Sequence, residues 1–580
     1  MKRTILLFSV AILCLLFCLG LVSCEDKYVT IKFNTMGGNT IESIQVEKGG
    51  KIPKPSDPEK LGYSFDKWCY EGVEWVFVGY VATEDMTLEA KWTPIEYTIE
   101  YVCEGTHSNK TSYTVENGFE LSDAIREKHI FLGWYEDKEY TKPIAKIEKG
   151  TMGSLTIYGK TQKSPLVLVR DGDEYTVSCW DKNITSVEIP SKHNGRPVTT
   201  IDIYGFEGCT RLESITIPNS VTKIGGLAFK DCTSLESITI HSSITKISGN
   251  VFKNCANLER IEVDEENKNY SSIDGNLYSK DEKTLIQYAP GKKETSFTVP
   301  NSVTIIDNRA FESCARIKFI TIPSSVTAIG EGAFFYCESL ISVGIENGVK
   351  TIGNRAFYYC TNLKIITIPS SVTAIEGNLI HDCARLERIE VDEENKNYSS
   401  IDGNLYSKDK KTLIQYASGK KETSFIVPNC VTTIENSAFD FCLSLTSVTI
   451  PSSVTKIAEE VFEDCIYVER IEVDKENKNY SSIDGNLYSK DQKTLIRYAE
   501  GKKETSFTIP SGVTKIGDCA FVGCALVSIT SPNSVKSIGY EAFSHCANLT
   551  IYCEAESQPS GWNSYWNDSN CPVVWDYKNK

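Results

Sequence analysis

The chain has 580 residues, with 61 Lys and Arg against 77 Asp and Glu, which gives a formal net charge of −16. This length exceeds what a single hydrophobic core supports, so we expect several domains or a repeat array. The acidic balance argues against nucleic acid as a partner, and a hydrophobic content of 41% excludes wholesale disorder.

The first 23 residues have the pattern of a secretory signal peptide. Lys2 and Arg3 precede an apolar run from residue 5 to residue 22. The run ends in Leu21-Val22-Ser23-Cys24, which resembles the lipobox of bacterial lipoproteins. The resemblance implies cleavage after Ser23 and acyl chains on Cys24, which would anchor an extracytoplasmic protein to a bacterial membrane. The alternatives are an ordinary signal peptide with a chance cysteine, or a lone membrane helix.

Residues 24–94 are predicted to form a small β module. Alternating strand patterns surround Gly37-Gly38, a Pro53-x-Pro55 pair, and a Gly62-Tyr-Ser-Phe-Asp-Lys-Trp68 stretch. This order resembles the Listeria-Bacteroides (internalin B-type) repeat, whose modules are β-grasp-like spacers on secreted proteins. A diverged second copy is expected at residues 95–164, without the Gly-Gly and the proline pair. We expect the aromatic side chains of both modules to be core residues.

From residue 165 to 552 the sequence is a repeat array. Eleven cysteines are separated by 23, 23, 59, 23, 23, 23, 59, 23, 59 and 22 residues. They are Cys209, Cys232, Cys255, Cys314, Cys337, Cys360, Cys383, Cys442, Cys465, Cys524 and Cys546. A Phe precedes ten of them by three positions, and apolar Leu and Ile positions follow. A fixed period of this length is typical of a solenoid, in which each coil is stabilised by its neighbours.

The repeated unit resembles the leucine-rich repeat of BspA-like (Treponema-type) surface proteins. The fold class we expect is therefore mainly β: a solenoid of 23-residue coils with a parallel sheet. The apolar residues of each short strand would point inward, and Ala-Phe-x-x-Cys would form a short helical turn.

Three spacings of 59 residues imply insertions of 36 residues. They lie near residues 264–300, 392–428 and 474–510 and are almost identical to one another. Asp-Gly and Lys-Asp turns between alternating strands predict a hairpin or small meander that bulges from the rod. The copies reflect either selection or recent duplication. The acidic start of each insertion only partly matches a calcium loop, so we predict no metal.

The repeated cysteine allows three interpretations: a disulfide, a metal ligand or a buried small side chain. Metal sites use Cys-x-x-Cys pairs, which are missing from this sequence, and an in-register ladder disfavours disulfides. We therefore expect a thiol that fills the same interior position of each coil. Better disulfide candidates are Cys69 with Cys103 and Cys553 with Cys571.

The outward positions of the repeat strands form the candidate binding face. They are mostly Ser and Thr, with an Arg-x-Glu pair just before each insertion. The candidates are Ser214, Thr216, Ser237, Thr239, Arg260, Glu262, Thr321, Thr367, Arg388, Glu390, Thr449, Arg470 and Glu472. Such a face suits an extended protein or glycan contact. The alternative is that Thr simply favours strands and water.

Residues 553–580 replace the repeat with aromatic residues and are predicted to cap the last coil. A glycan-stacking site made by Trp562, Trp566 and Trp575 is the second interpretation, and it requires exposed indoles.

The sequence contains no recognisable catalytic motif, so we expect neither an enzyme nor a cofactor. BspA-like proteins are implicated in adhesion. The resemblance therefore implies a cell-surface adhesin whose partners are extracellular proteins, either host matrix or bacterial. A surface glycan-binding protein is the alternative function.

Overall fold

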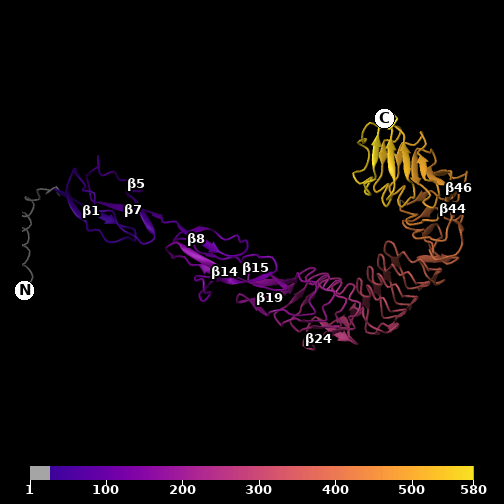
Figure 1. Cartoon of the computed structure of the whole chain (residues 1–580), viewed down its shortest axis with the longest axis horizontal. Coiled ribbons are helices and arrows are strands. Elements are labelled where there is room, and N and C mark those ends of the chain that lie inside the picture. Colours follow the sequence, from indigo (N-terminus) through magenta and orange to yellow (C-terminus); the bar gives the residue numbers. More distant parts are fainter. Residues whose placement is uncertain (1–26, 459, 579–580) are drawn as a thin grey trace, which may run out of the picture. The chain divides into compact units, whose positions relative to one another are not determined.

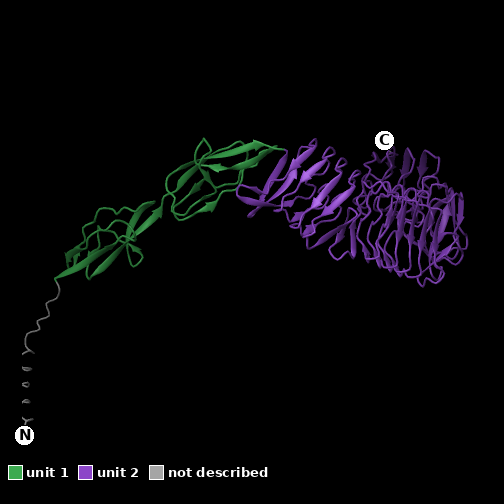
Figure 2. Cartoon of the chain, turned by 90° about the horizontal axis from the view of Figure 1, so that it is seen from below, with its two compact units in different colours: residues 1–164 green, residues 165–580 purple. Residues whose placement is uncertain are grey.

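The computed structural model describes residues 27–458 and 460–578, which fall into two compact units, residues 1–164 and 165–580 (Figure 2). The expected signal peptide and Cys24 lie outside the described residues. Within the described ranges the regular elements are strands, and no helix there has the length and apolar character needed to span a bilayer.

The first unit contains two modules with the same sheet topology (Figure 1). In the first, the strand order is β2-β1-β7-β4-β5, and β1 and β7 are parallel. In the second, the order β9-β8-β14-β11-β12 repeats this arrangement, although the Gly-Gly and the proline pair are missing. The five strands of the first sheet are β1 (Tyr28–Asn34), β2 (Ile44–Glu47), β4 (Tyr63–Tyr70), β5 (Val73–Glu74) and β7 (Met86–Pro94). The five strands of the second sheet are β8 (Tyr97–Val102), β9 (Ser112–Tyr113), β11 (His129–Tyr135), β12 (Pro143–Ile144) and β14 (Leu155–Lys163).

Two short strand pairs complete these modules: β3 (Gly50–Lys51) with β6 (Val81–Ala82), and β10 (Phe119–Glu120) with β13 (Lys146–Ile147). Trp68 and Trp134 are buried in the two cores. These two indoles are thus core residues, as expected.

The second unit is a solenoid built from two series of parallel strands, of which only one was expected. The strands of the predicted series, here called the repeat strands, are β17 (Ser186–Glu188), β20 (Ser214–Thr216), β22 (Ser237–Ile240), β24 (Arg260–Val263), β28 (Ser296–Thr298), β30 (Phe319–Ile322), β32 (Ser342–Ile345), β35 (Ile365–Ile368), β38 (Arg388–Val391), β42 (Ser424–Ile426), β44 (Ser447–Ile450), β46 (Arg470–Val473), β50 (Ser506–Thr508), β52 (Ser528–Ser531), β54 (Thr550–Cys553) and β55 (Val573–Trp575). Residues 23 apart pair directly, as Ile238 does with Ile261. The predicted leucine-rich-repeat solenoid is confirmed.

The second series runs through the Val-Thr-x-Ile part of each coil. Its strands are β16 (Glu174–Cys179), β19 (Arg196–Ile201), β21 (Lys223–Ile224), β23 (Lys246–Ile247), β27 (Thr284–Gln287), β29 (Ile305–Ile306), β31 (Ala328–Ile329), β33 (Thr351–Ile352), β36 (Ala374–Ile375), β41 (Thr412–Gln415), β43 (Thr433–Ile434), β45 (Lys456–Ile457), β49 (Thr494–Arg497), β51 (Lys515–Ile516) and β53 (Ser537–Ile538). Two further strands flank its start, β15 (Leu166–Asp171) and β18 (Lys192–His193). A separate pair, β34 (Phe357–Tyr358) with β37 (Ile380–His381), lies elsewhere in the coil.

The expected helical turn at Ala-Phe-x-x-Cys is wrong. Its N–H groups bond to the neighbouring coil, as Phe229 N–H does to the Val251 carbonyl at 3.0 Å, which leaves only a single turn from Phe229 to Cys232. The residue before the cysteine has a left-handed backbone conformation, with φ of 60° at Asp231. This conformation cannot continue a right-handed helix.

The coil interior is a continuous apolar stack. Successive phenylalanines lie in offset-stacked contact, with ring centroids 5.1 Å apart for both Phe311–Phe334 and Phe334–Phe357. The adjoining Leu, Ile, Val and Cys side chains are almost fully buried. Each coil therefore depends on its neighbours for its core.

Each insertion contains the expected hairpin, which continues antiparallel into a third strand, but it also supplies an additional coil and so does not simply bulge from the rod. The hairpins are β25 (Tyr270–Ile273) with β26 (Asn276–Ser279), β39 (Tyr398–Ile401) with β40 (Asn404–Ser407), and β47 (Tyr480–Ile483) with β48 (Asn486–Ser489). After the hairpin, Tyr288 enters the phenylalanine stack 5.2 Å from Phe311, and β27 and β28 join the two strand series. The apolar residues of the insertion are thereby buried in the solenoid wall.

A buried asparagine fixes each insertion to the preceding coil. Asn267 is fully buried, and its amide donates to the carbonyls of His241 and Ile244. Its carbonyl oxygen accepts the N–H groups of Asn269 and Tyr270. Asn395 and Asn477 make the same four bonds, so the acidic segment that partly resembles a calcium loop is a hydrogen-bonded turn.

Candidate binding surface

The predicted outward residues do lie on the outer side of the repeat strands. In β22 and β30 exposed and buried residues alternate strictly, because successive side chains of a strand point to opposite faces. Ser214, Thr216, Ser237, Thr239, Arg260, Thr321, Arg388, Glu390 and Arg470 are exposed, and Glu262, Thr367, Thr449 and Glu472 are half-buried. Together these thirteen residues are called the strand face below.

The Arg-x-Glu pairs on the strand face form ion pairs. Arg260 Nε donates to Glu262 at 2.6 Å, Arg388 Nε to Glu390 at 3.0 Å, and Arg470 Nε to Glu472 at 2.8 Å. All six side chains are exposed or only half-buried, so the pairs add little to stability. They therefore present the same fixed charge pattern at three places along the solenoid.

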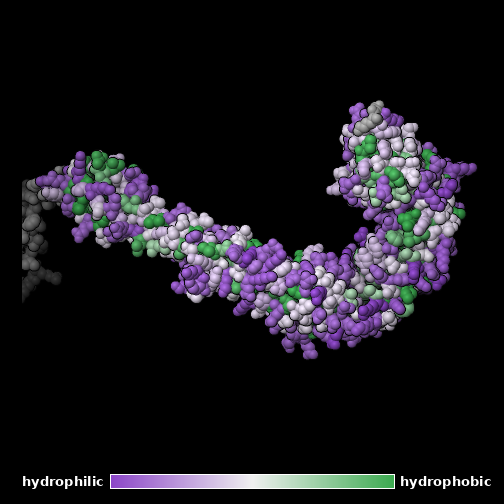
Figure 3. Space-filling view, in the orientation of Figure 1, coloured by the Kyte–Doolittle hydropathy of each residue, from purple (hydrophilic) through white to green (hydrophobic). Residues whose placement is uncertain are grey.

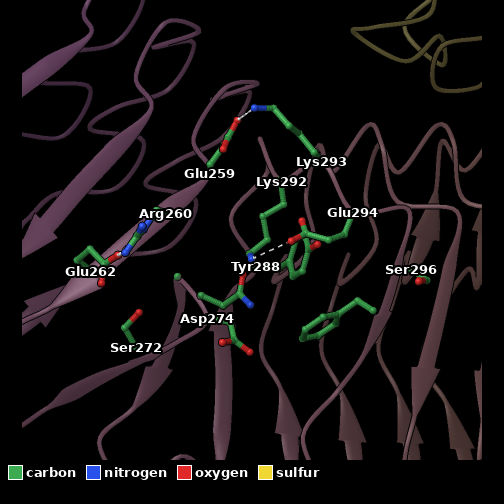
Figure 4. A pocket seen from close by; sticks show the side chains of 13 residues that line it. Glu259, Arg260, Glu262, Ser272, Asp274, Tyr288, Lys292, Lys293, Glu294 and Ser296 are labelled. Carbon is green, nitrogen blue, oxygen red and sulfur yellow. Dashed lines mark hydrogen bonds and ion pairs between the residues drawn. The ribbon is translucent and has the colours of Figure 1, made fainter.

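A pocket opens beside the first of these pairs (Figure 4). Its volume is ≈ 760 Å³, and its walls come from the start of β24, the hairpin turn at Asp274, and the segment from Lys292 to Phe297. Lys293 pairs with Glu259 at 2.6 Å on its rim. A pocket of ≈ 770 Å³ lies at the equivalent place in the third insertion, lined by Arg470, Asp484 and Lys503 among others. The first and third insertions thus place charged hollows next to the strand face.

The pocket wall depends on a glycine in the hairpin turn. Gly275 has φ of +74°, and a Cβ there would lie 3.2 Å from the Arg260 Cα atom. Gly403 and Gly485 have the same positive φ and the same close approach to Arg388 and Arg470. A side chain at these positions would be strained and would push the turn away from the strand.

The cysteines of the repeat are buried free thiols, as expected. The Cys232 Sγ donates to the Phe206 carbonyl of the preceding coil at 3.2 Å, and six further coils make the equivalent contact. Burial raises the pKa of Cys232 to about 12. The Cys232 thiol therefore fills space and is not an activated nucleophile.

The suggested disulfides are not formed. Cys69, Cys103, Cys553 and Cys571 are all free in the structure. Cys571 instead donates to the Cys546 carbonyl at 3.4 Å. It therefore extends the pattern of thiol contacts into the final segment.

The C-terminal tryptophans close the solenoid, and this corrects the glycan-stacking interpretation. Trp562 and Trp566 are 6% and 5% exposed and pack in the last core cluster, where Trp566 meets Phe543 edge-on. Trp575 is half-buried and packs on Trp562. Indoles that cover the last coil are not available to stack on a sugar.

Sequence reasoning missed a cluster of aromatic and charged residues at the edge of the turn segments. Phe335 stacks on Tyr358 at 4.9 Å, and Tyr358 stacks on His381 at 4.2 Å. His381 in turn contacts Asp440, which lies 59 residues later. The one signal in the sequence is that His381 and Asp440 occupy the same position, two residues before a repeated cysteine. Predicting their contact also requires knowing that the inserted coil between them lacks the Ala-Phe-x-x-Cys segment.

Ionisable groups around His381 have shifted pKa values. Burial raises the pKa of Asp382 to about 6 and also raises those of Asp440 and Glu463. For His381, burial lowers the pKa, but the hydrogen bond and charge of Asp440 outweigh it, so the net direction is upward. Carboxylates are therefore concentrated here in a region of low solvent access.

The family-model comparisons identify both parts of the chain. The BspA type leucine rich repeat region matches residues 176–290, 287–412, 415–499 and 497–570, and the Listeria-Bacteroides repeat domain matches residues 30–91 and 97–160. The chain belongs to the BspA-type leucine-rich-repeat family, with two Listeria-Bacteroides repeats before the solenoid.

Several similar proteins are bacterial. A leucine rich cell surface protein from Faecalibacterium prausnitzii is 30% identical over 70% of this chain and 96% of its own, with a TM-score of 0.40. The pneumococcal vaccine antigen PcpA is 21% identical over 71% of this chain and 98% of its own, with a TM-score of 0.36. A candidate membrane protein from Evansella cellulosilytica is 30% identical over 157 residues. The chain spans about a quarter of that relative's length.

Proposed function

We propose that this protein is a lipid-anchored, extracytoplasmic adhesin that binds other proteins through the strand face. The observation that carries the proposal is the regular exposure of that face along the solenoid, with the same charged pocket wall repeated beside it. A flat array of short polar side chains allows close contact with an extended surface. Leucine-rich-repeat families generally supply such scaffolds, which supports a binding role over a catalytic one.

The proposed partners are extracellular proteins of a host matrix or of other bacteria, and Cys24 would supply the attachment to the membrane. The lipobox resemblance and the surface location named for the Faecalibacterium relative support this placement. The proposal involves no nucleic acid and no cofactor. A glycan partner has less support, because two of the three tryptophans that would stack on sugar, Trp562 and Trp566, are in the core.

The test compares capture of extracellular proteins by the full processed chain and by two variants. The face variant carries Arg260→Ala, Arg388→Ala and Arg470→Ala, which removes one exposed charge beside each insertion. The control variant carries Lys223→Ala, Lys246→Ala and Lys515→Ala, which removes three exposed charges from the second strand series. Loss of capture in the face variant alone would support the proposal. Equal capture by both variants would refute the use of this face.

A further inference from the structure

The cluster around His381 has the composition of a metal site. His381, Asp440 and Asp464 each offer one ligand atom, and these three atoms lie within 4.8 Å of one another. The residues come from three different coil segments, before and after the second insertion. No local motif indicates this site, because its ligands are 59 and 24 residues apart along the chain.

The inserted coil brings the ligands together. It lacks the Ala-Phe-x-x-Cys segment, so the segments on either side of it meet directly. The Asn378 amide donates to the Ser437 hydroxyl at 2.9 Å across this junction, and His381 Nδ1 contacts the Asp440 carboxylate. Asp464 follows in the next coil, immediately before Cys465.

One carboxylate oxygen in the cluster has no partner. The Asp440 side chain is fully buried, and its Oδ1 atom makes no hydrogen bond within the described part of the chain. No Lys or Arg forms an ion pair with Asp440 or Asp464 among the described residues. A buried carboxylate oxygen without a donor is costly, and a cation would satisfy it.

The first insertion shows how the fold neutralises the same position without a metal. Lys253 and Glu312 occupy the places of His381 and Asp440, each two residues before a repeated cysteine. Glu312 is 2% exposed, and it pairs with Lys253 at 3.2 Å and with Arg309 at 3.3 Å. In the second insertion a histidine replaces the lysine, so the permanent positive charge is missing and a metal ligand stands in its place.

We propose that His381, Asp440 and Asp464 bind one divalent transition-metal ion of the Zn²⁺ class. One imidazole and two carboxylates suit such an ion, and two carboxylates balance its charge. Ligand atoms around a tetrahedral zinc lie ~3.4 Å apart, so the side chains need only small movements to surround it. Tyr358 stacks on the imidazole at 4.2 Å, and Phe441 meets its edge at 5.8 Å, which fixes the ring in position.

The site would join the two halves of the solenoid at the second insertion. Three protein ligands leave a fourth position for water or for an atom from a partner. Because the ligands lie on both sides of the inserted coil, the metal is expected to raise the unfolding temperature of the solenoid.

Zn²⁺ titration of the full chain, stripped of metal by a chelator, tests the proposal by calorimetry. We expect one ion per chain and a Zn²⁺-dependent rise in unfolding temperature. Asp440→Asn and His381→Lys should each weaken binding by at least ~10-fold. His381→Lys recreates the Lys-acid pair of the first insertion, so this variant should fold without metal. Glu312→Gln, at the matched position of the first insertion, should bind Zn²⁺ as the unchanged chain does.

Cobalt separates this site from the many thiols of the chain. Co²⁺ bound by one imidazole and two carboxylates should give weak visible bands without the strong near-ultraviolet band of cobalt-thiolate bonds. A chain that takes up no Zn²⁺ stoichiometrically would overturn the proposal. Binding that His381→Lys leaves unchanged, or a cobalt-thiolate spectrum, would overturn it equally.

Discussion

At the scale of single residues, the repeated cysteine shows how one side chain serves both packing and hydrogen bonding. Its buried thiol fills a small interior position. It donates to the carbonyl of the phenylalanine in the preceding coil, as Cys337 does to Phe311 at 3.1 Å. That carbonyl faces the interior and would otherwise lose part of its hydrogen bonding. The position therefore favours a small side chain with a weak donor.

Thiol labelling checks this account. Among the eighteen described cysteines Cys430 alone is exposed, and Cys103 is half-buried. In a chain beginning at Glu25, we expect one fast-reacting thiol in the folded state, lost in Cys430→Ser, and reaction of all thiols in denaturant. Burial protects the rest from the reagent. Fast reaction of several thiols in the native chain would contradict the packing described here.

Glu500 gives the solenoid a pH dependence. It pairs with Arg497 at 3.3 Å, both side chains are buried, and burial raises the pKa of Glu500 from 4.5 to about 7. The folded state therefore binds this proton more tightly than the unfolded state. Its contribution to stability is complete below pH 4.5 and is lost as the pH rises to about 7.

Glu500→Gln should remove this contribution to the pH profile. Chemical unfolding between pH 5 and pH 7.5 should show the unchanged chain losing up to about 3 kcal/mol relative to the variant. Glu294→Gln, which alters an exposed carboxylate, should follow the unchanged chain. If the free energy of unfolding changed with pH in the same way for all three proteins, the pKa of Glu500 would not be raised in the folded state.

At the scale of elements, the inserted coils explain how a 59-residue spacing fits a 23-residue solenoid. The hairpin supplies the bonds that β24 would otherwise make to a next strand, as Ile261 N–H does to the Gly275 carbonyl at 2.8 Å. The segment after the hairpin then adds a strand to each of the two strand series. The buried asparagine (Asn267, Asn395 or Asn477) fixes the point at which the chain leaves the repeat strand to form the hairpin.

Asn395→Ala should loosen the second insertion. It removes four hydrogen bonds and leaves buried backbone groups unpaired, at a cost of roughly 2–3 kcal/mol. Hydrogen exchange should become faster in residues 392–428. Asn397→Ala, at an exposed position two residues later, should leave exchange unchanged. Normal exchange in Asn395→Ala would show that the hairpin itself holds the insertion.

The coil spacing and the repeat strands could be predicted because interior positions recur at a fixed period. The second strand series could not, since two-residue strands such as Lys223–Ile224 are too short to produce an alternating pattern. The inserted coil was hidden because Tyr288 replaces the phenylalanine and no cysteine follows it. The His381–Asp440 contact depends on that hidden coil, so it was also beyond prediction.

At the scale of the whole molecule, the solenoid needs a closed end. On the face shown in Figure 3, hydrophobic residues are scattered among hydrophilic ones. The final coil would expose Phe543 and Ile551 if Trp562 and Trp566 did not cover them. The aromatic residues after residue 553 are therefore understood as a structural cap.

Trp566→Ala should destabilise this end of the solenoid by about 3–5 kcal/mol, because it leaves a large cavity against Phe543. Limited proteolysis should then cut first within residues 530–578. Tyr565→Ala is the control, since Tyr565 is 60% exposed. Equal resistance of both variants would show that Trp566 contributes little to the cap.

Anchoring is a property of the whole protein in its cell. If Cys24 carries lipid, Cys24→Ser should move the protein from the membrane fraction to the soluble fraction, because acyl chains supply the attachment. The repeat units are unchanged by this substitution, so binding to partners should persist. Retention of Cys24→Ser in the membrane fraction would contradict the lipid anchor.

Protein binding by the strand face is the main function proposed for this chain. Its most direct test is capture of extracellular proteins by the Arg260→Ala, Arg388→Ala, Arg470→Ala chain, compared with the unchanged chain and with the Lys223→Ala, Lys246→Ala, Lys515→Ala control. We expect the same partner to be captured by the unchanged chain and the control and to be lost from the face variant. Undiminished capture by the face variant would contradict it.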